Sequence, residues 1–352
     1  MKTLRRYLAG MLLWTTLLAL AALVALFAFI SLIDQLEEVG RGSYGVLQAV
    51  TYVLLTMPRL ASELFPIAAM IGSMATLGIL AQNSELAVIR TAGVSSAQLA
   101  ALLARAALLL VVLAVINSEL VAPFSEEKAQ NLRSLSLTQQ ITLKSKYGFW
   151  ARDGNSYINI RKILPGKRVE QIYIYEFDDN SRLRTSTRAR QARYVQDRWL
   201  LENISQTIMD GESIQKRQLK QAAWESLLDP EMLNLIIIEP QYLTLVGLFG
   251  YIKYLHENAQ DSRLYEQALW VKLVRPFSIL AMIILAVPMV RVHMRSMPVG
   301  QRVFQGALAG VIFHILSQAS GNMGMVYGIA SAISVAAPTV VLAGVLLWLL
   351  RD

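Results

Sequence analysis

Cysteine is absent from this chain, and histidine and charged residues are scarce. Without cysteine the chain forms no disulfide, no zinc–thiolate site and no thiol nucleophile, whatever the redox state of its compartment. Its three histidines, at positions 256, 293 and 314, are scattered and belong to no H-E-x-x-H motif. The G-x-x-x-x-G-K-[ST] motif of P-loop ATPases and the G-x-S-x-G motif of serine hydrolases are also missing. We therefore expect neither an enzyme nor an ATP site of the P-loop kind.

Apolar residues make up 55% of the 352 residues and charged residues only 16%, a balance too hydrophobic for an ordinary soluble protein. A helix needs about 20 apolar residues to cross the hydrocarbon core of a bilayer. The first apolar run follows basic residues, as in a signal peptide. It is too long for one and lacks an Ala-x-Ala cleavage site at its end, so we interpret it as a retained span. Six runs meet the requirement: 8–33, 52–81, 99–116, 268–290, 303–320 and 329–350.

Charge in the loops predicts the orientation of these six spans. Basic residues gather on one side, at Lys2, Arg5, Arg6, Arg90, Arg291, Arg295, Arg302 and Arg351. The loops on the other side carry Asp34, Glu37, Glu38 and Arg41, or no charge at all. The positive-inside rule therefore places both termini in the cytoplasm and segment 117–267 outside it. We attribute the net charge of +8 to the cytoplasmic loops and predict no nucleic-acid partner.

Segment 117–267 separates two groups of three spans and has the pattern of a β domain. Asp153-Gly154 is a hairpin signal between two short apolar runs, and residues 171–177 are β-branched and aromatic. We predict strands at 149–152, 157–160, 171–177, 192–195, 199–205 and 218–224, and helical arms at 124–143 and 245–258. The predicted fold is an α-helical integral membrane protein with six transmembrane helices (3+3) and an inserted all-β, jelly-roll-like domain. The predicted domains are residues 1–123, 124–266 and 267–352.

A short helix is predicted at residues 84–92, in a loop that this topology places in the cytoplasm. Ser84 is the predicted N-cap, Glu85 lies at the positive end of the helix dipole, and Gly93 ends the helix in a left-handed turn. Ser95 and Gln98 then form a capping box for the next helix. A helix this short is unstable alone, so Leu86, Val88 and Ile89 must pack either on their own bundle or on a partner.

Ionisable residues inside apolar spans are often functional because burying a charge there is unfavourable. Glu63, Arg105 and Lys272 lie near estimated span ends, so we predict that they extend towards the interface. His314 lies deeper, without a carboxylate in its span, and is predicted to bond to a neighbouring helix.

Gly306 and Gly310 form a G-x-x-x-G motif in the fifth span. The motif permits close contact either within this chain or with another subunit, and we assign it to a subunit-interface helix.

A transporter without its own ATP site must use either an ion gradient or a separate ATPase. Carriers driven by gradients usually place ionisable groups near the middle of the membrane, and carboxylates are almost missing from the centres of these spans. The exposed helix at 84–92 therefore favours docking of an ATPase.

Several short motifs, in one order along nearly the whole chain, resemble the LptF/LptG family of lipopolysaccharide export permeases, and its LptG branch most closely. Near the N-terminus they are Asp34-Gln35-Leu36 with Gly42-Ser43-Tyr44, the NSEL…AGVS stretch at 83–95, and Val121-Ala122-Pro123. Further along they are Gly148, Trp150, Arg152, Asp153 and Gly154 in the hairpin, and Arg295, Ser296, Pro298, Gly300 and Arg302 between spans four and five.

The resemblance implies a permease subunit of an ABC transporter in the bacterial inner membrane. Such a subunit extracts lipopolysaccharide from the outer leaflet and passes it to a periplasmic bridge towards the outer membrane. The implied partners are a homologous LptF-like permease, a cytoplasmic LptB-like ATPase dimer, a single-span LptC-like regulator and an LptA-like bridge protein. ATP and Mg belong to the ATPase, and the chain itself binds no cofactor.

The resemblance also implies roles for individual residues. Glu85, with Leu86, Ile89 and Arg90, belongs to the helix that couples the permease to the ATPase. Arg133 and its expected neighbour Arg41 meet the phosphates of lipid A, because arginine binds phosphate in a strong bidentate geometry. The chain departs from some family members at Glu37 and Glu38, where lysines occur elsewhere.

Two alternatives stay open. One is an ABC-type mechanotransmitter or lipoprotein-releasing permease, although such chains usually have four spans with the large domain between the first two. The other is a membrane scaffold that transports nothing and recruits periplasmic partners.

Overall fold

The computed structural model describes most of the chain. Gly148, Arg295 and Ser296 of the family motifs lie outside the described residues, as does the end of the predicted helical arm at 124–143. The described residues are 2–138, 149–164, 168–178, 180–195, 198–210, 213–224, 239–292 and 298–351.

The chain divides into two compact units, which we describe separately. The first unit comprises Met1–Asp34, Val53–Ser125 and Arg263–Asp352, and the second comprises Gln35–Tyr52 and Glu126–Ser262. The second unit thus includes the turn between the first two helices, which the sequence analysis placed with the spans. The domain limits 1–123, 124–266 and 267–352 stay a prediction.

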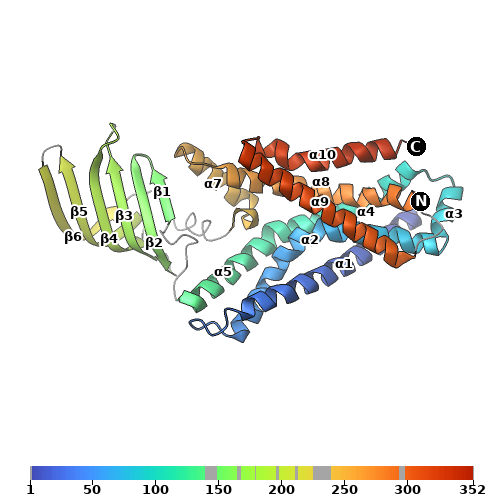
Figure 1. Ribbon diagram of the computed structural model, residues 1–352, viewed down its shortest axis with the longest axis horizontal. Helices are drawn as coiled ribbons and strands as arrows, with labels where there is room; N and C mark the ends of the chain where they lie inside the picture. Colours follow the sequence, from blue (N-terminus) through green and yellow to red (C-terminus); the bar gives the residue numbers. More distant parts are fainter. Residues whose placement is uncertain are drawn as a thin grey trace. The chain divides into compact units, whose positions relative to one another are not determined.

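The first unit is a bundle of long apolar helices (Figure 1). Six helices are long and apolar enough to cross a membrane, over Thr3–Leu36, Val46–Gln82, Ser96–Leu137, Arg263–Val290, Val299–Tyr327 and Ser331–Leu349. This confirms the prediction of six spans, three on each side of the inserted domain. The helices of the unit are α1 (Lys2–Leu36), α2 (Val46–Gln82), α3 (Glu85–Thr91), α4 (Ser96–Ile116), α8 (Arg263–Val292), α9 (Val299–Tyr327) and α10 (Ser331–Leu349).

Small and hydroxylated residues bring α1 and α2 close together. A Cβ atom at Gly72 would lie 2.5 Å from the Cα atom of Thr16, so only glycine fits there. The neighbouring Thr15 hydroxyl lies 2.9 Å from the Gly72 carbonyl oxygen and 2.8 Å from the Thr76 hydroxyl. Lipid tails are as apolar as leucine side chains, so close packing and hydrogen bonds of this kind hold membrane helices together.

A π-helix (Asn117–Val121) joins α4 to α5 (Ala122–Thr138) and is tied to two other helices. The Lys272 ammonium of α8 lies 2.7 Å from a Glu119 carboxylate oxygen and donates to the Ser118 carbonyl at 3.1 Å. The side-chain amide of Asn117 donates to the Pro58 carbonyl of α2 at 2.7 Å. The Lys272 side chain is 3% exposed, so the prediction that it extends to the interface is wrong. A carboxylate far away in sequence supplies its partner instead.

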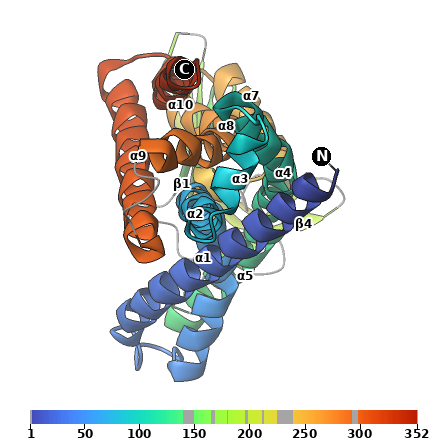
Figure 2. The ribbon, with the colours of Figure 1, turned by 90° about the vertical axis from the view of Figure 1, so that its right-hand side faces the viewer.

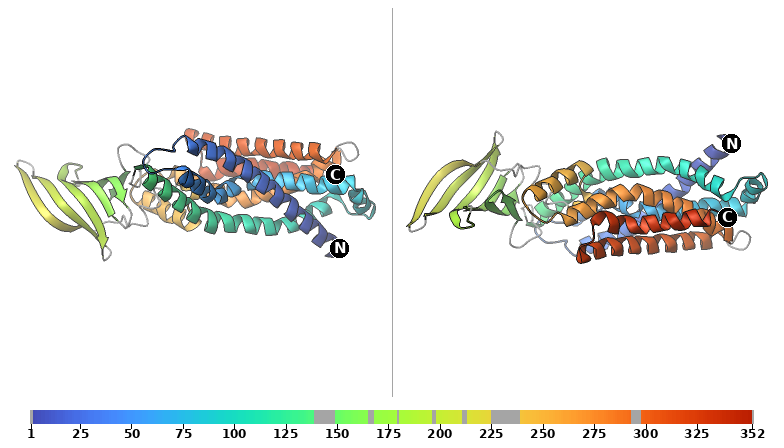
Figure 3. Two further views of the ribbon diagram at one scale, coloured as in Figure 1. Left: turned by 90° about the horizontal axis from the view of Figure 1, so that it is seen from below. Right: turned by 90° about the horizontal axis from the view of Figure 1, so that it is seen from above.

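The second unit contains a single antiparallel sheet of six described strands in the order β1-β2-β3-β4-β5-β6 (Figure 3). The inserted all-β domain is thereby confirmed, including the hairpin at Asp153-Gly154. Consecutive strands pair along the described sheet, a simpler order than the two Greek keys of a jelly roll. The strands are β1 (Phe149–Asp153), β2 (Ser156–Leu164), β3 (Arg168–Phe177), β4 (Leu183–Val195), β5 (Arg198–Asp210) and β6 (Ser213–Trp224).

One row of cross-strand neighbours shows where the sheet is covered. Ile160, Ile172, Ala189 and Ile204 lie opposite one another on β2 to β5 and are all buried. The next residue in the row, Leu219 on β6, is exposed. The hydrophobic core of the sheet therefore ends before its last strand.

Helix α7 (Leu245–Glu257) packs at the opposite edge, against β1. The Tyr254 hydroxyl donates to the Arg152 carbonyl at 2.9 Å, and the Gly154 amide donates to the Asn258 side chain at 3.2 Å. Burial and the charge of Asp153 raise the pKa of Tyr254 to about 12. The phenol therefore keeps its proton at physiological pH and serves as a permanent donor that fixes this helix.

We expect Lys272→Met to lower the free energy of unfolding by about 3–5 kcal/mol, because the half-buried Glu119 carboxylate would lose its buried counterion. The midpoint of thermal unfolding of the full-length protein in detergent measures this loss. Adding Glu119→Gln should restore part of it. Lys253→Met is the matched control, since Lys253 forms only an exposed ion pair with Glu257 at 3.8 Å. Equal losses for the two lysine variants would contradict the buried pair.

Glu202 should make the sheet sensitive to acid. Hydrogen bonds from Arg193 and Gln191 lower the pKa of Glu202. Because the folded pKa lies below the unfolded one, this stabilisation is complete above the unfolded pKa and disappears as the pH falls through the folded pKa. We expect Glu202→Gln to lower the unfolding midpoint at about pH 6 and to have little effect at about pH 3. An effect of equal size at both pH values would refute the charge-based stabilisation.

Candidate functional site

Helix α3 lies at the end of the bundle that also holds both chain termini (Figure 1), beside the first turns of α1 (Figure 2). The predicted cap at Ser84 is wrong. This residue has a left-handed backbone (φ 62°), and its side chain makes no capping hydrogen bond. Instead, one carboxylate oxygen of Glu85 accepts from the side-chain amide of Asn83 at 3.3 Å and from the Tyr7 hydroxyl of α1 at 3.4 Å. Glu85 thus connects α3 to α1.

The end of α3 follows the prediction. Gly93 has a positive φ of 86°, which glycine adopts without strain. Its amide donates to the Arg90 carbonyl at 2.9 Å, and the Val94 amide donates to the Ile89 carbonyl, which together make a Schellman motif. The capping box of Ser95 and Gln98 is also confirmed. The Schellman motif that ends α3 and the capping box that begins α4 therefore hold α3 in place between α2 and α4.

The apolar face of α3 belongs to the chain's own core. Leu86 is 1% exposed and packs in the hydrophobic cluster of the bundle, and Ile89 is also buried. Neither side chain is therefore accessible to a partner, and their role in ATPase coupling stays a prediction. Val88 lies on the other face and is 65% exposed. The surface that α3 offers thus combines exposed Val88 with the half-buried Glu85 and Arg90.

Arg133, the predicted phosphate ligand on α5, is held by Glu38 from the turn after α1. The Arg133 terminal nitrogen lies 2.7 Å from one carboxylate oxygen of Glu38, and the Arg133 Nε atom lies 3.3 Å from the other. The Arg133 guanidinium also sits over the Tyr52 ring, 5.5 Å from its centre. Glu38 thus occupies the edge of the Arg133 guanidinium, with two N–H donors, that a phosphate would bind. We call Arg133, Glu38 and Tyr52 the guanidinium clasp.

The other predicted ligand, Arg41, belongs to the same turn as Glu38. Its backbone amide donates to the Glu38 carbonyl at 3.2 Å, and its side chain is exposed. Arg41 thus contacts the backbone of Glu38 within one turn, whereas Arg133 contacts the Glu38 carboxylate in an ion pair. The assignment of both arginines to lipid phosphates stays a prediction.

Gly306 and Gly310 of α9 face α2 of the same chain. A Cβ atom at Gly306 would lie 2.9 Å from the Met74 side chain, and one at Gly310 would lie 3.2 Å from the Cα atom of Ile67. The close contact that these glycines permit is therefore used within the chain. The glycine face of α9 is thus occupied by α2, and the place of α9 in a subunit interface stays a prediction.

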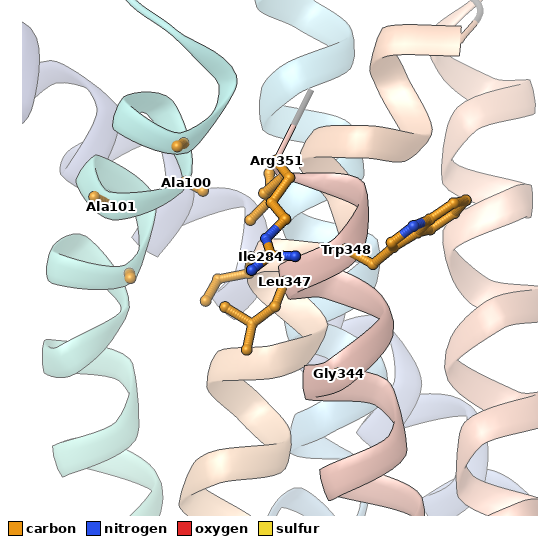
Figure 4. Close-up of a pocket in the computed structure, with 10 residues that line it drawn as sticks. Ala100, Ala101, Ile284, Gly344, Leu347, Trp348 and Arg351 are labelled. Carbon is orange, nitrogen blue, oxygen red and sulfur yellow. The ribbon is translucent and has the colours of Figure 1, made fainter.

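A cavity of about 670 Å³ opens between α4, α8 and α10, away from all the predicted site residues. Figure 4 shows Ala100 and Ala101 of α4 facing Leu347 and Arg351 across it, while the Trp348 ring points away from α4. Its lining is apolar apart from Arg351. The described part of the chain also holds no group of three or more His, Asp or Glu residues arranged to bind a metal ion.

Sequence reasoning missed that Glu38 and Tyr52 contact Arg133. Glu38 is 95 positions away from Arg133, and its pairing depends on how the turn after α1 lies against α5. The departure at Glu37-Glu38 was the only signal in the sequence, because an acid in an expected basic region suggests a nearby counterion.

The comparisons with known proteins agree with this architecture. The sequence matches the family described as "Lipopolysaccharide export system permease LptF/LptG" over residues 6–352. The lipopolysaccharide export system permease protein LptG of Escherichia coli K12 is 33% identical over 348 residues, which cover 98% of this chain and 97% of that protein. LptG of Haemophilus influenzae is 33% identical over 351 residues, covering 99% of this chain and 98% of that protein.

The match spans both units rather than one of them, and the six candidate spans around an inserted sheet are consistent with it. The chain is therefore a multi-pass inner-membrane protein. It belongs to the LptF/LptG family of lipopolysaccharide export system permeases.

Proposed function

We propose that this chain extracts lipopolysaccharide from the outer leaflet of the inner membrane and passes it to a periplasmic bridge. The observation that carries the proposal is the family match over residues 6–352, which includes the spans, the helix α3 and the inserted sheet. The six candidate spans also weigh against a lipoprotein-releasing permease, which usually has four spans and an earlier insertion. A scaffold without transport has no specific observation in its favour.

The proposed complex contains a homologous LptF-like permease, an LptB-like ATPase dimer, an LptC-like regulator and an LptA-like bridge. In our proposal both termini and α3 face the cytoplasm, and the sheet lies in the periplasm. The concentration of arginine and lysine in the loops on one side supports this orientation. ATP and Mg bind to the ATPase, and this chain binds no cofactor.

We further propose that α3 transmits the ATPase cycle to the bundle. Leu86 and Ile89 pack in the core, so a force on the outer face of α3 moves the bundle rather than the helix alone. The bond between Tyr7 and Glu85 extends that connection to α1. Val88 gives the outer surface of α3 an exposed apolar side chain, and Glu85 gives it a charge. The ATPase would bind α3 through these two side chains.

Glu85→Lys should abolish the stimulation of ATPase activity by lipopolysaccharide, while the permease still assembles. The charge reversal changes the outer surface of α3 and breaks the contact with Tyr7. Glu37→Lys is the matched control, since it makes the same charge change at an exposed position in the other unit. Full stimulation in Glu85→Lys would remove the coupling role.

Val88→Asp and Leu86→Ala should separate docking from packing. Val88→Asp is expected to impair ATPase coupling without lowering the unfolding midpoint, because Val88 is exposed. Leu86→Ala is expected to lower the free energy of unfolding by about 2–5 kcal/mol, because it creates a cavity in the core. Thermal unfolding and ATPase rates of the purified complex measure the two effects. The contrary result would be a Val88→Asp variant that has a lowered unfolding midpoint but normal ATPase coupling per folded molecule.

A further inference from the structure

The guanidinium clasp places an acid where the proposed function requires an open basic site. Both oxygens of Glu38 contact Arg133, and the two side chains are 22% and 32% exposed, respectively. A carboxylate and a phosphate present the same pair of acceptor oxygens to arginine. The two groups therefore compete for one edge of the Arg133 guanidinium.

The turn that carries Glu38 is fastened independently of the Glu38 side chain. The Ser43 amide donates to the Ser136 carbonyl of α5 at 2.8 Å, and the Gly40 amide donates to the Tyr44 carbonyl at 2.9 Å. Gly42 has a φ of 60°, and a Cβ atom there would lie 2.6 Å from the Ser136 carbonyl oxygen. The backbone therefore stays against α5 when the carboxylate leaves Arg133.

Arg133 also keeps a contact when Glu38 leaves. The Tyr52 ring lies under its guanidinium and is buried, so this stacking does not depend on which anion is bound. The clasp thus has a cation and a turn backbone that are each held by contacts independent of the Glu38 carboxylate. Because the turn is tethered, Glu38 remains at a high effective concentration beside Arg133.

We propose that Glu38 is an internal competitor that the phosphate of the transported lipid must displace from Arg133. This inference rests on the proposed transport of lipopolysaccharide and on the prediction that Arg133 binds its phosphate. Glu38 weakens binding by the amount needed to break its own ion pair, and it speeds release by returning to Arg133. The clasp thereby keeps a strong arginine–phosphate contact reversible, which a site that passes its substrate onward requires.

The test measures the lipopolysaccharide concentration that half-saturates binding to the purified full complex. The two probes are fully phosphorylated and enzymatically dephosphorylated lipopolysaccharide. Glu38→Gln should bind the phosphorylated form about tenfold more tightly, since it loses a charge-assisted competitor. It should leave the affinity for the dephosphorylated form unchanged. Glu38→Asp, which keeps the charge but shortens the reach, should fall between wild type and Glu38→Gln.

Glu37→Gln is the matched control, because Glu37 is the exposed neighbour of Glu38. It removes the same charge without touching the clasp, so its affinity should remain that of wild type. An equal gain in Glu37→Gln and Glu38→Gln would reduce the effect to general electrostatics and overturn the proposal. Thermal unfolding of each variant confirms that the affinities are compared between folded proteins.

The remaining outcomes separate this inference from the proposed function. If Arg133→Gln weakens binding and Glu38→Gln does not change it, Arg133 is a phosphate ligand and the competitor role is wrong. If Arg133→Gln has no effect, the proposed phosphate site itself fails. If Glu38→Gln weakens binding and a chelator does the same to wild type, Glu38 holds a bridging divalent cation, which also overturns competition.

Discussion

The fold depends on one constraint: inside an apolar bundle, polar groups must find their partners within the protein. Lys272 meets this requirement through Glu119, and the Asn117 side chain does so through the Pro58 carbonyl. Both contacts converge on the π-helix between α4 and α5, where the regular hydrogen-bond pattern of the helix changes. The chain therefore leaves the membrane segment through a junction that is pinned to two other helices.

Internal contacts also shape the two places where the chain meets other molecules in our account. At α3, Leu86 and Ile89 turn into the core and leave a small outer surface with exposed Val88 and the half-buried Glu85 and Arg90. At the guanidinium clasp, an arginine that would otherwise lie half-buried and unpaired takes a carboxylate from the same chain. In both cases an internal contact holds the functional residue in place until an external partner competes for it.

Much of the fold could be predicted from the sequence, because hydrophobic length and strand alternation are local signals. The six spans, the hairpin at Asp153-Gly154 and the capping box at Ser95 follow from residues close together in the chain. The errors concern long-range partners. Lys272 was expected at the interface because Glu119 is far away in sequence. The packing of Leu86 stayed open in the sequence because a helix pattern does not show which body covers its apolar face. The ion pair of Arg133 with Glu38 likewise depends on a turn whose position only the fold defines.

The central claim is that this chain acts as one half of a permease driven by a separate ATPase. The most direct measurement is purification of the tagged chain from native membranes, followed by quantification of the proteins that accompany it. The account predicts a homologous second permease in equal amount together with an ATPase dimer. Recovery of the chain alone, or only with copies of itself and no ATPase, would contradict it.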